Sequence, residues 1–358
     1  MSVRVAVVGL GWVCRELWLP LLREHADFEV VAAVDADPAA RQAFTKATGI
    51  ATHSSVAALS AREVDLAVVA VPNHLHTEVA GALLAGGISV FLEKPVCLTS
   101  DEVDVLAAAE RSGGMLVAGS AARYRGDVEA LRQVLPELGD IRHVTLGWVR
   151  ARGVPRAGGW FTQRDKAGGG ALFDLGWHLL DTLAFLLGPA AFTRVIGVTS
   201  DDFVNAGGWR AAWREDEPDA GTADVEDTAR GFLVRDDGIA VSLRASWASH
   251  EARDVSLIKV EGSAGTAELR CTFGFSPNRE PEPVLTVTSE GTTKRLALPV
   301  ERIGVEYTRQ LAGLAGVLAE PANRGKAIAE ARPIVQLIEN FYASAGTAGA
   351  RRAEPAYQ

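Results

Sequence analysis

Cysteine, long apolar runs and clusters of basic residues are all scarce in this sequence. The three cysteines, Cys14, Cys97 and Cys271, are odd in number and widely spaced, so neither a disulfide framework nor a zinc site is indicated. This pattern favours a reducing compartment. The apolar stretches are strand-length or amphipathic, so we expect no membrane-spanning helix. Residues Met1–Gly9 lack the apolar core of a signal peptide, and a cytoplasmic protein is predicted.

Positive charge is also in short supply. Lys and Arg number 36 against 45 Asp and Glu, which gives a formal net charge of -9. An acidic protein has no general attraction for nucleic acid or for an anionic membrane. No run of Lys and Arg provides a local exception. We therefore expect a small-molecule partner, with no nucleic acid and no membrane.

The first third of the chain alternates short apolar runs with amphipathic stretches. With 358 residues, the chain is long enough for two domains. The predicted strands are Val3–Val8, Phe28–Val34, Leu66–Val71, Ile88–Leu92 and Met115–Ala118. Strands that alternate with helices predict a doubly wound parallel sheet covered on both faces. We assign this α/β domain to residues 1–121.

The pattern changes after about Ser120, where strand-like segments follow one another with turn signals between them. A helix interrupts them at Leu172–Leu187, and two more close the chain. Residues 122–358 are therefore predicted to form an α+β domain with a large, mostly antiparallel sheet. The polar stretch Asn205–Val225 is predicted as an inserted loop, in which Trp209 and Trp213 are candidates for lining a pocket or an interface.

A glycine turn follows the first strand and opens a helix. Gly9 permits the tight turn, and Gly11 lets a pyrophosphate approach the helix N-terminus. Cys14 stands at the third glycine position. Asp35 ends the second strand, where a carboxylate accepts from a ribose 2′-hydroxyl and favours NAD, although Arg41 nearby could serve the 2′-phosphate of NADP. A turn that merely joins a strand to a helix is the alternative. The candidate cofactor contacts here are Gly9, Gly11, Trp12, Val13 and Asp35.

Two further signals carry titratable side chains. Lys94, within Glu93–Pro95, follows a strand at its carboxyl end, where ligands bind in open α/β sheets; an exposed ion pair is the alternative. Three glycines then precede a helix on which Asp174 and His178 share one face, four residues apart. Polar groups in an apolar helix must be solvated, paired or functional. A capped helix with a satisfied core histidine is the alternative here.

These motifs together resemble the glucose-fructose oxidoreductase/inositol dehydrogenase (Gfo/Idh/MocA) family of NAD(P)-dependent oxidoreductases. The matching segments are Val7–Cys14, Trp18–Leu22, Val71–His76, Glu93–Pro95, Arg123–Arg125 and Gly168–Asp181, with a weaker match at Val225–Ala229. The resemblance implies an N-terminal Rossmann domain and a C-terminal domain whose open sheet often makes an interface, hence a homodimer or homotetramer. It implies that Lys94, Asp174 and His178 are catalytic and that the Lys94–Pro95 bond is cis. It also places Pro72, Asn73 and His76 near the nicotinamide and its ribose, with Glu93 and Lys94 among the cofactor contacts.

We predict hydride transfer between NAD, or NADP, and a secondary alcohol or ketone of a sugar, inositol or similar polyol. His178 is assigned as general acid/base, and Lys94 is assigned to stabilise charge on the same oxygen. Lys94 is the alternative acid/base, and Asp174 binds a neighbouring hydroxyl or tunes the other two. The candidate substrate residues are Arg123, Tyr124, Trp160 and Asp181, and no metal is expected.

Two other functions stay open. The first is a reductase of a nucleotide-linked keto-sugar in secondary metabolism, or of an aromatic diol. The arginines that could meet a diphosphate are Arg123, Arg125, Arg152 and Arg156. The second is a non-catalytic NAD(P)-binding sensor of the same fold. Such a sensor has no need of Lys94, Asp174 and His178, which this chain keeps together.

Overall fold

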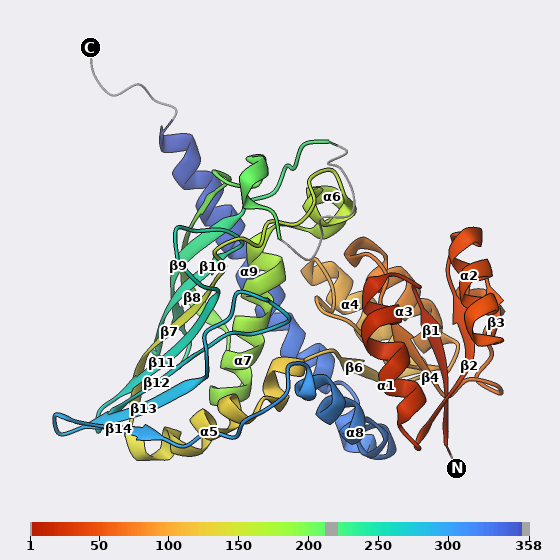
Figure 1. Ribbon diagram of the computed structural model, residues 1–358, viewed down its shortest axis with the longest axis horizontal. Coiled ribbons are helices and arrows are strands. Elements are labelled where there is room, and N and C mark those ends of the chain that lie inside the picture. Colours follow the sequence, from red (N-terminus) through yellow and green to blue (C-terminus); the bar gives the residue numbers. More distant parts are fainter. Residues whose placement is uncertain (1, 212–220, 353–358) are drawn as a thin grey trace. The chain divides into compact units, whose positions relative to one another are not determined.

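The computed structural model describes residues 2–211 and 221–352 (Figure 1). Met1–Ala121 and Tyr307–Arg332 form a first unit, and Ala122–Glu306 and Pro333–Gln358 form a second. The sequence prediction placed all residues after 121 in one domain, whereas in the structure Tyr307–Arg332 belongs to the first unit. The reason is packing, because the helix at 305–319 buries two leucines in the core around Trp18.

The first unit is built on a six-stranded parallel sheet. Its strands are β1 (Val3–Val8), β2 (Phe28–Val34), β3 (Ala51–His53), β4 (Leu66–Val69), β5 (Ser89–Leu92) and β6 (Leu116–Ala118). They pair in the order β3-β2-β1-β4-β5-β6, every pair being parallel. This is the doubly wound order, with its topological switch between β1 and β4. The predicted α/β class of this domain is confirmed.

Helices cover both faces of the parallel sheet. They are α1 (Leu19–Glu24), α2 (Pro38–Thr48), α3 (His76–Ala85), α4 (Ser100–Ser112), α8 (Val305–Ala319) and the first turns of α9 (Lys326–Arg352). The Asp37 carboxylate accepts from Ala39 N–H at the start of α2, and Gly49 ends that helix with φ +73°. The helix predicted to follow the glycine turn is split, because a π-helical turn at Val13–Trp18 precedes α1.

The second unit is built on an eight-stranded sheet. Its strands are β7 (Ile141–Val149), β8 (Phe192–Ser200), β9 (Thr228–Arg235), β10 (Ala240–Ser246), β11 (Val255–Gly262), β12 (Thr266–Cys271), β13 (Val284–Ser289) and β14 (Thr292–Leu296). The order is β14-β13-β12-β11-β7-β10-β9-β8, and β7 and β10 pair in parallel while the other neighbours are antiparallel. The predicted mostly antiparallel sheet is confirmed.

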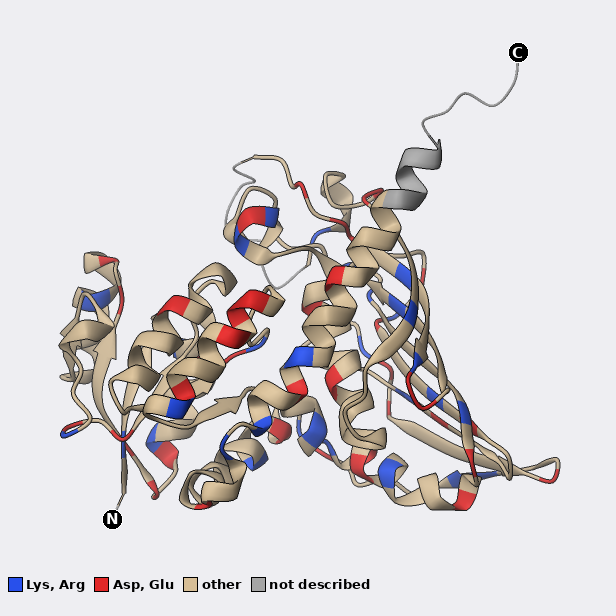
Figure 2. Ribbon diagram, turned by 180° about the vertical axis from the view of Figure 1, so that it is seen from behind, with Lys and Arg blue, Asp and Glu red and all other residues tan. Residues whose placement is uncertain are grey.

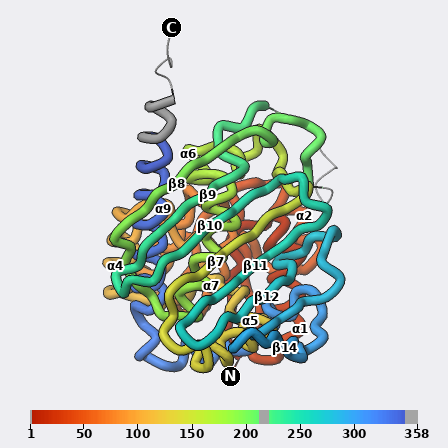
Figure 3. The backbone as a smooth tube through the Cα atoms, turned by 90° about the vertical axis from the view of Figure 1, so that its left-hand side faces the viewer, coloured from red at the N-terminus to blue at the C-terminus, as the bar shows by residue number. Residues whose placement is uncertain are grey.

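One face of this sheet packs on helices and the other is open. Helices α5 (Gly126–Val134), α7 (Trp177–Leu187) and the later part of α9 lie on the inner side. Figure 3 looks onto the opposite face, which no helix of the described residues covers. On β8 and β9 this face carries Ile196 and Phe232, 63% and 46% exposed. Acidic and basic residues are interspersed over both units (Figure 2).

One helical stretch, at residues 164–187, is long and apolar enough to cross a membrane by length and composition. Of its most apolar window, 72% is buried within the protein. The core helix of a globular domain has this character. The stretch contains α6 (Arg164–Ala167) and α7, and it carries two of the candidate catalytic residues.

Candidate active site

The candidate residues fall in both units, and each group is described within its own unit. In the first, the glycine turn follows β1 directly. Gly9 N–H donates to the Val34 carbonyl at 2.8 Å, and Gly9 adopts φ +88°. A Cβ there would lie 2.6 Å from the Ala70 carbonyl oxygen, so both conformation and space require glycine. At Gly11, by contrast, a Cβ would meet nothing within 4 Å. This open space fits the approach of a pyrophosphate.

Cys14 occupies the third glycine position of the turn. Its side chain is 1% exposed and belongs to the same core as Trp18. Burial raises the pKa of the Cys14 thiol to about 12, so the thiol is uncharged at neutral pH and serves as a small core residue. Trp12, which is 52% exposed, and Val13, which is half-buried, follow Gly11 directly in the chain.

Asp35 stands just after β2 and braces the glycine turn. One carboxylate oxygen accepts from Leu10 N–H at 2.7 Å and the other from Asp37 N–H at 2.8 Å. Arg41 Nη1 donates to the main-chain carbonyls of Asp35 and Ala36 at 2.7 and 2.9 Å. A carboxylate suits a ribose 2′-hydroxyl and a guanidinium suits a 2′-phosphate. The end of β2 therefore offers groups for NAD and for NADP.

His76 connects the loops that follow β4 and β5. Its Nδ1 lies 2.6 Å from the Pro95 carbonyl and its Nε2 lies 3.0 Å from the Val71 carbonyl. Burial lowers the pKa of His76 to about 4, so the ring is neutral at pH 7. A neutral imidazole has one N–H, which we assign to Nδ1 because that contact is shorter. Pro72 and Asn73 lie in the loop after β4, where Asn73 is buried.

Lys94 is fixed through its backbone. The Lys94–Pro95 peptide bond is cis, as the resemblance implied. Lys94 N–H donates to Glu93 Oε2 at 3.1 Å, and Trp18 Nε1 donates to Glu93 Oε1 at 2.7 Å. Desolvation of the Glu93 carboxylate raises its pKa, although part of the residue stays exposed. These contacts set the direction in which the chain enters and leaves Lys94.

In the second unit, Asp174 and His178 lie on one helix. It opens with a π-helical turn at Leu172–Gly176 and continues as α7. Trp247 Nε1 donates to Asp174 Oδ2 at 2.8 Å, and the His178 ring lies 5.5 Å from the Trp148 ring. Trp148 lies in β7, and Trp247 follows the parallel neighbour β10. The carboxyl ends of this parallel pair therefore contact both side chains, and π-helical turns are frequent at functional sites.

The glycine run of the second unit packs against protein. A Cβ at Gly169 would lie 2.0 Å from the Tyr342 hydroxyl, and one at Gly170 would lie 1.8 Å from the Glu226 carbonyl oxygen. The Glu226 carboxylate accepts from Gly170 N–H and Leu172 N–H at 3.0 Å and from the Tyr342 hydroxyl at 2.8 Å. It caps the helix from 54 residues away. Local sequence around the run gave no sign of either partner.

All four predicted substrate residues lie in the second unit and none is fully exposed: Arg123, Tyr124, Trp160 and Asp181. Arg123 and Asp181 bind each other, with Nε–Oδ2 at 3.0 Å and Nη2–Oδ1 at 2.5 Å. A bidentate pair of this kind balances both charges. The Trp160 ring lies 5.0 Å from Phe161, whose ring lies 6.0 Å from Trp247. Trp160 is therefore connected through the Phe161 ring to Trp247, the residue that donates to Asp174.

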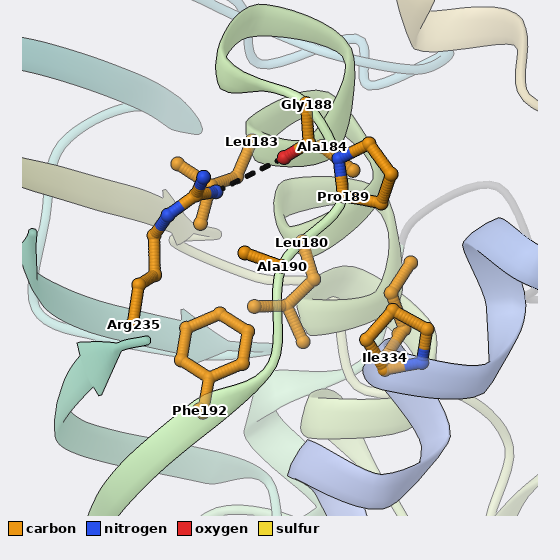
Figure 4. Close-up of a pocket in the computed structure, with 10 residues that line it drawn as sticks. Leu180, Leu183, Ala184, Gly188, Pro189, Ala190, Phe192, Arg235 and Ile334 are labelled. Carbon is orange, nitrogen blue, oxygen red and sulfur yellow. Dashed lines mark hydrogen bonds between the residues drawn. The ribbon is translucent and has the colours of Figure 1, made fainter. Parts of the chain in front are cut away.

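The pocket drawn in Figure 4 lies at the carboxyl end of α7 and contains none of these residues. Leu183 and Phe192 line it, and Arg235 donates to the Gly188 carbonyl at 3.1 Å. Across residues 2–211 and 221–352, no three His, Cys, Asp or Glu side chains come together as a metal site. Trp213 of the predicted insertion lies outside the described residues.

Comparisons with known proteins match both units. A family model described as "Oxidoreductase family, NAD-binding Rossmann fold" matches residues 3–120, and one described as "GFO/IDH/MocA C-terminal domain" matches residues 128–268. An Amycolatopsis mediterranei (strain S699) protein is 83% identical over 100% of both chains. It is provisionally named a UDP-kanosamine synthase oxidoreductase subunit. D-glucoside 3-dehydrogenase of Escherichia coli (strain K12) is 30% identical over 72% of this chain and 74% of that protein.

A solved structure has the same fold along nearly the whole chain. GenD2 from gentamicin A biosynthesis, in complex with NAD, superposes with a TM-score of 0.75. The alignment covers 97% of this chain and 95% of that one, at 23% identity. Similarity at this level concerns the fold.

Proposed function

The chain belongs to the GFO/IDH/MocA family of NAD(P)-dependent sugar oxidoreductases, and from this we propose that it oxidises the 3-hydroxyl of a nucleotide-linked hexose to the ketone. The observation that carries the proposal is the 83% identity to the Amycolatopsis protein over the full length of both chains. Kanosamine is an amino sugar, and an amine condenses with a ketone rather than with an alcohol. Carbon 3 is suggested by the name of the 30% identical glucoside 3-dehydrogenase. A second chain would carry the amine-transfer step.

We assign three side chains to the proton and the charge in this reaction. A nicotinamide cofactor held at the glycine turn of Gly9 and Gly11 would supply the acceptor for the hydride of the carbinol carbon. His178 removes the hydroxyl proton, and the Lys94 ammonium donates a hydrogen bond to the same oxygen. The alcohol thereby loses a hydride and a proton and becomes the ketone. Asp174, held by Trp247 at 2.8 Å, orients a neighbouring hydroxyl or the other two groups.

The test is turnover with a panel of substrates. UDP-glucose, methyl glucoside, free glucose and myo-inositol are incubated with NAD or NADP, and the reduced cofactor is followed by absorbance. We expect UDP-glucose to give the highest kcat/KM, with the carbonyl located at carbon 3 after reduction with borodeuteride. Turnover of unlinked sugars with none of UDP-glucose would contradict the proposal. It would favour a glucoside or polyol dehydrogenase, as the Escherichia coli relative suggests.

We propose that the open face of the second unit joins copies of the chain as a homodimer or homotetramer. Ile196 and Phe232 are paired across β8 and β9 and are 63% and 46% exposed there. Large apolar side chains grouped on a monomer surface are typical of an interface. Light scattering of the wild type and of Phe232→Glu tests this, with a smaller species expected for the variant. All three cysteines are buried within the protein, which fits the proposed cytoplasmic location.

A further inference from the structure

Of the four arginines that the sequence offered for a diphosphate, three differ in their partners. Arg123 pairs with Asp181, and Arg125 pairs with Asp127 at 2.6 Å with its side chain 13% exposed. Arg152 differs, because it is exposed and no carboxylate of the described residues pairs with it. Its Nη1 donates to the carbonyls of Ala151 and Ser249, so no carboxylate of the residues that the structure describes offsets its positive charge.

Arg152 is held in place by aromatic rings. Its guanidinium carbon lies 3.8 Å from the centroid of the Trp209 ring. Trp209 packs against Phe203 at 4.4 Å and against the exposed His250 at 5.2 Å. We call these four residues the Arg152–Trp209 group. The buried Asp227 carboxylate fixes the loop that carries Phe203, accepting from its N–H at 2.6 Å.

The Arg152–Trp209 group lies at the carboxyl edge of the parallel β7–β10 pair. Arg152 follows β7, and its backbone forms a bridge with Ala248, which follows β10. Ala248 comes directly after Trp247, whose indole donates to Asp174. The backbone of Arg152 is therefore paired with the residue that follows Trp247, whose indole holds Asp174.

A surface hollow adjoins the same two loops. It is open to solvent, and its walls include Val154, Pro155, Asn205 and Arg210. Val154 N–H donates to the Trp209 carbonyl at 3.1 Å, which ties the wall of the hollow to the Arg152–Trp209 group. An arginine stacked on an aromatic ring, beside a concave surface with backbone polar groups, suits an anion attached to a flat heterocycle.

We propose that the Arg152–Trp209 group and the adjoining hollow bind the nucleoside diphosphate of the substrate. The Arg152 guanidinium takes the diphosphate, and the hollow takes the nucleoside. This inference rests on the proposed function, since it supplies the part of the site that a nucleotide-linked sugar needs and a free sugar does not. The sugar itself then extends along the edge towards Trp247 and Asp174.

The test is calorimetric titration of the full chain, saturated with NADH, with UDP and with UMP. We expect Arg152→Ala to raise the Kd for UDP about 10- to 100-fold, the loss typical of one charge-assisted contact. Arg152→Lys keeps part of the affinity, and Trp209→Ala raises the Kd several-fold. Arg142→Ala is the matched control, because Arg142 is an exposed arginine at the other end of β7, paired with Asp140.

Comparison of UDP with UMP separates a phosphate contact from a folding defect. If Arg152 binds the diphosphate, Arg152→Ala loses most of the preference for UDP over UMP, whereas a misfolded second unit loses both ligands equally. If the wild type turns over UDP-glucose and Arg152→Ala binds UDP with unchanged affinity, this inference is overturned and the proposed function stands. A wild type that binds no UDP and turns over only unlinked sugars would overturn both.

Discussion

The two glycine-rich segments of this protein look alike in sequence and differ in what surrounds them. In the first unit, Gly9 is pressed against the Ala70 carbonyl, but Gly11 faces open space. In the second unit, Tyr342 occupies the space beside Gly169, and Glu226 occupies the space beside Gly170. Glycine is therefore required by protein packing at Gly9, Gly169 and Gly170, and at Gly11 it borders open space that we assign to a ligand. The neighbours of the missing Cβ, rather than the motif, distinguish these uses.

The same contrast extends to the side chains of each unit. In the first unit, Asp35 and Lys94 follow strands directly, and the Asp35 carboxylate accepts from the main-chain N–H groups of Leu10 and Asp37. In the second unit, Asp174 is held by Trp247, 73 residues away in sequence. Its helix is capped by Glu226. Asp35 is thus held by main-chain N–H groups, whereas Asp174 is held by a side chain that is distant in sequence.

The largest effect that sharpens this contrast is expected from Gly170→Ala. The new Cβ would lie 1.8 Å from the Glu226 carbonyl oxygen, so backbone must move and the cap is disturbed. We expect the free energy of unfolding to fall by about 3 kcal/mol, measured by urea denaturation. Gly346→Ala, on α9 with nothing within 4 Å, is the control and should change stability by about 1 kcal/mol or less. If Gly170→Ala is as stable as the wild type, Gly170 is not required by packing, and the contrast with Gly11 is contradicted.

The next largest effect concerns acid stability of the first unit. His76 has a folded pKa of about 4, below the ordinary value of 6.5, because it is buried. Between these values the unfolded chain binds the proton and the folded chain does not. Stability is therefore full above about pH 6.5 and is lost as pH falls towards 4, by up to about 3 kcal/mol. Urea denaturation at pH 7 and pH 4.5 should show a smaller difference in His76→Asn; an equal difference contradicts the assignment.

A smaller effect is expected when the bond between Trp247 and Asp174 is removed. Trp247→Phe keeps an aromatic ring but loses the indole N–H that donates to Asp174 at 2.8 Å. We expect kcat to fall about tenfold, equivalent to about 1.4 kcal/mol, with the Kd for NADH unchanged. An unchanged kcat would show that Asp174 is held without this distant partner.

The smallest effect on stability is expected from Gly11→Ala. A Cβ there meets nothing within 4 Å, so the free energy of unfolding should change by about 0.5 kcal/mol or less. The methyl group takes up the space that we assign to the pyrophosphate, so the Kd for NADH should rise about tenfold. Gly81→Ala, on α3 with open surroundings, should alter neither quantity. Unchanged NADH affinity in Gly11→Ala would place the cofactor elsewhere.

Sequence alone predicted what depends on local patterns. The order of strands and helices gave both sheets, and the glycine turn with Asp35 follows from strand ends. It did not predict the return of residues 307–332 to the first unit, because an amphipathic helix does not reveal which core it joins. It also could not pair Arg123 with Asp181, 58 residues apart. Such partners depend on tertiary packing, which cannot be predicted from the spacing of residues along the chain.

The most direct test of this account is a pair of measurements on His178→Ala. We assign hydride acceptance to a cofactor that the first unit would hold, and proton transfer to a side chain of the second. We therefore expect kcat to fall about 100-fold or more, while the Kd for NADH, measured by fluorescence titration, stays within about twofold of the wild type, or about 0.4 kcal/mol. Near-normal turnover would contradict this division between the units. A variant that loses both NADH binding and turnover would contradict it as well.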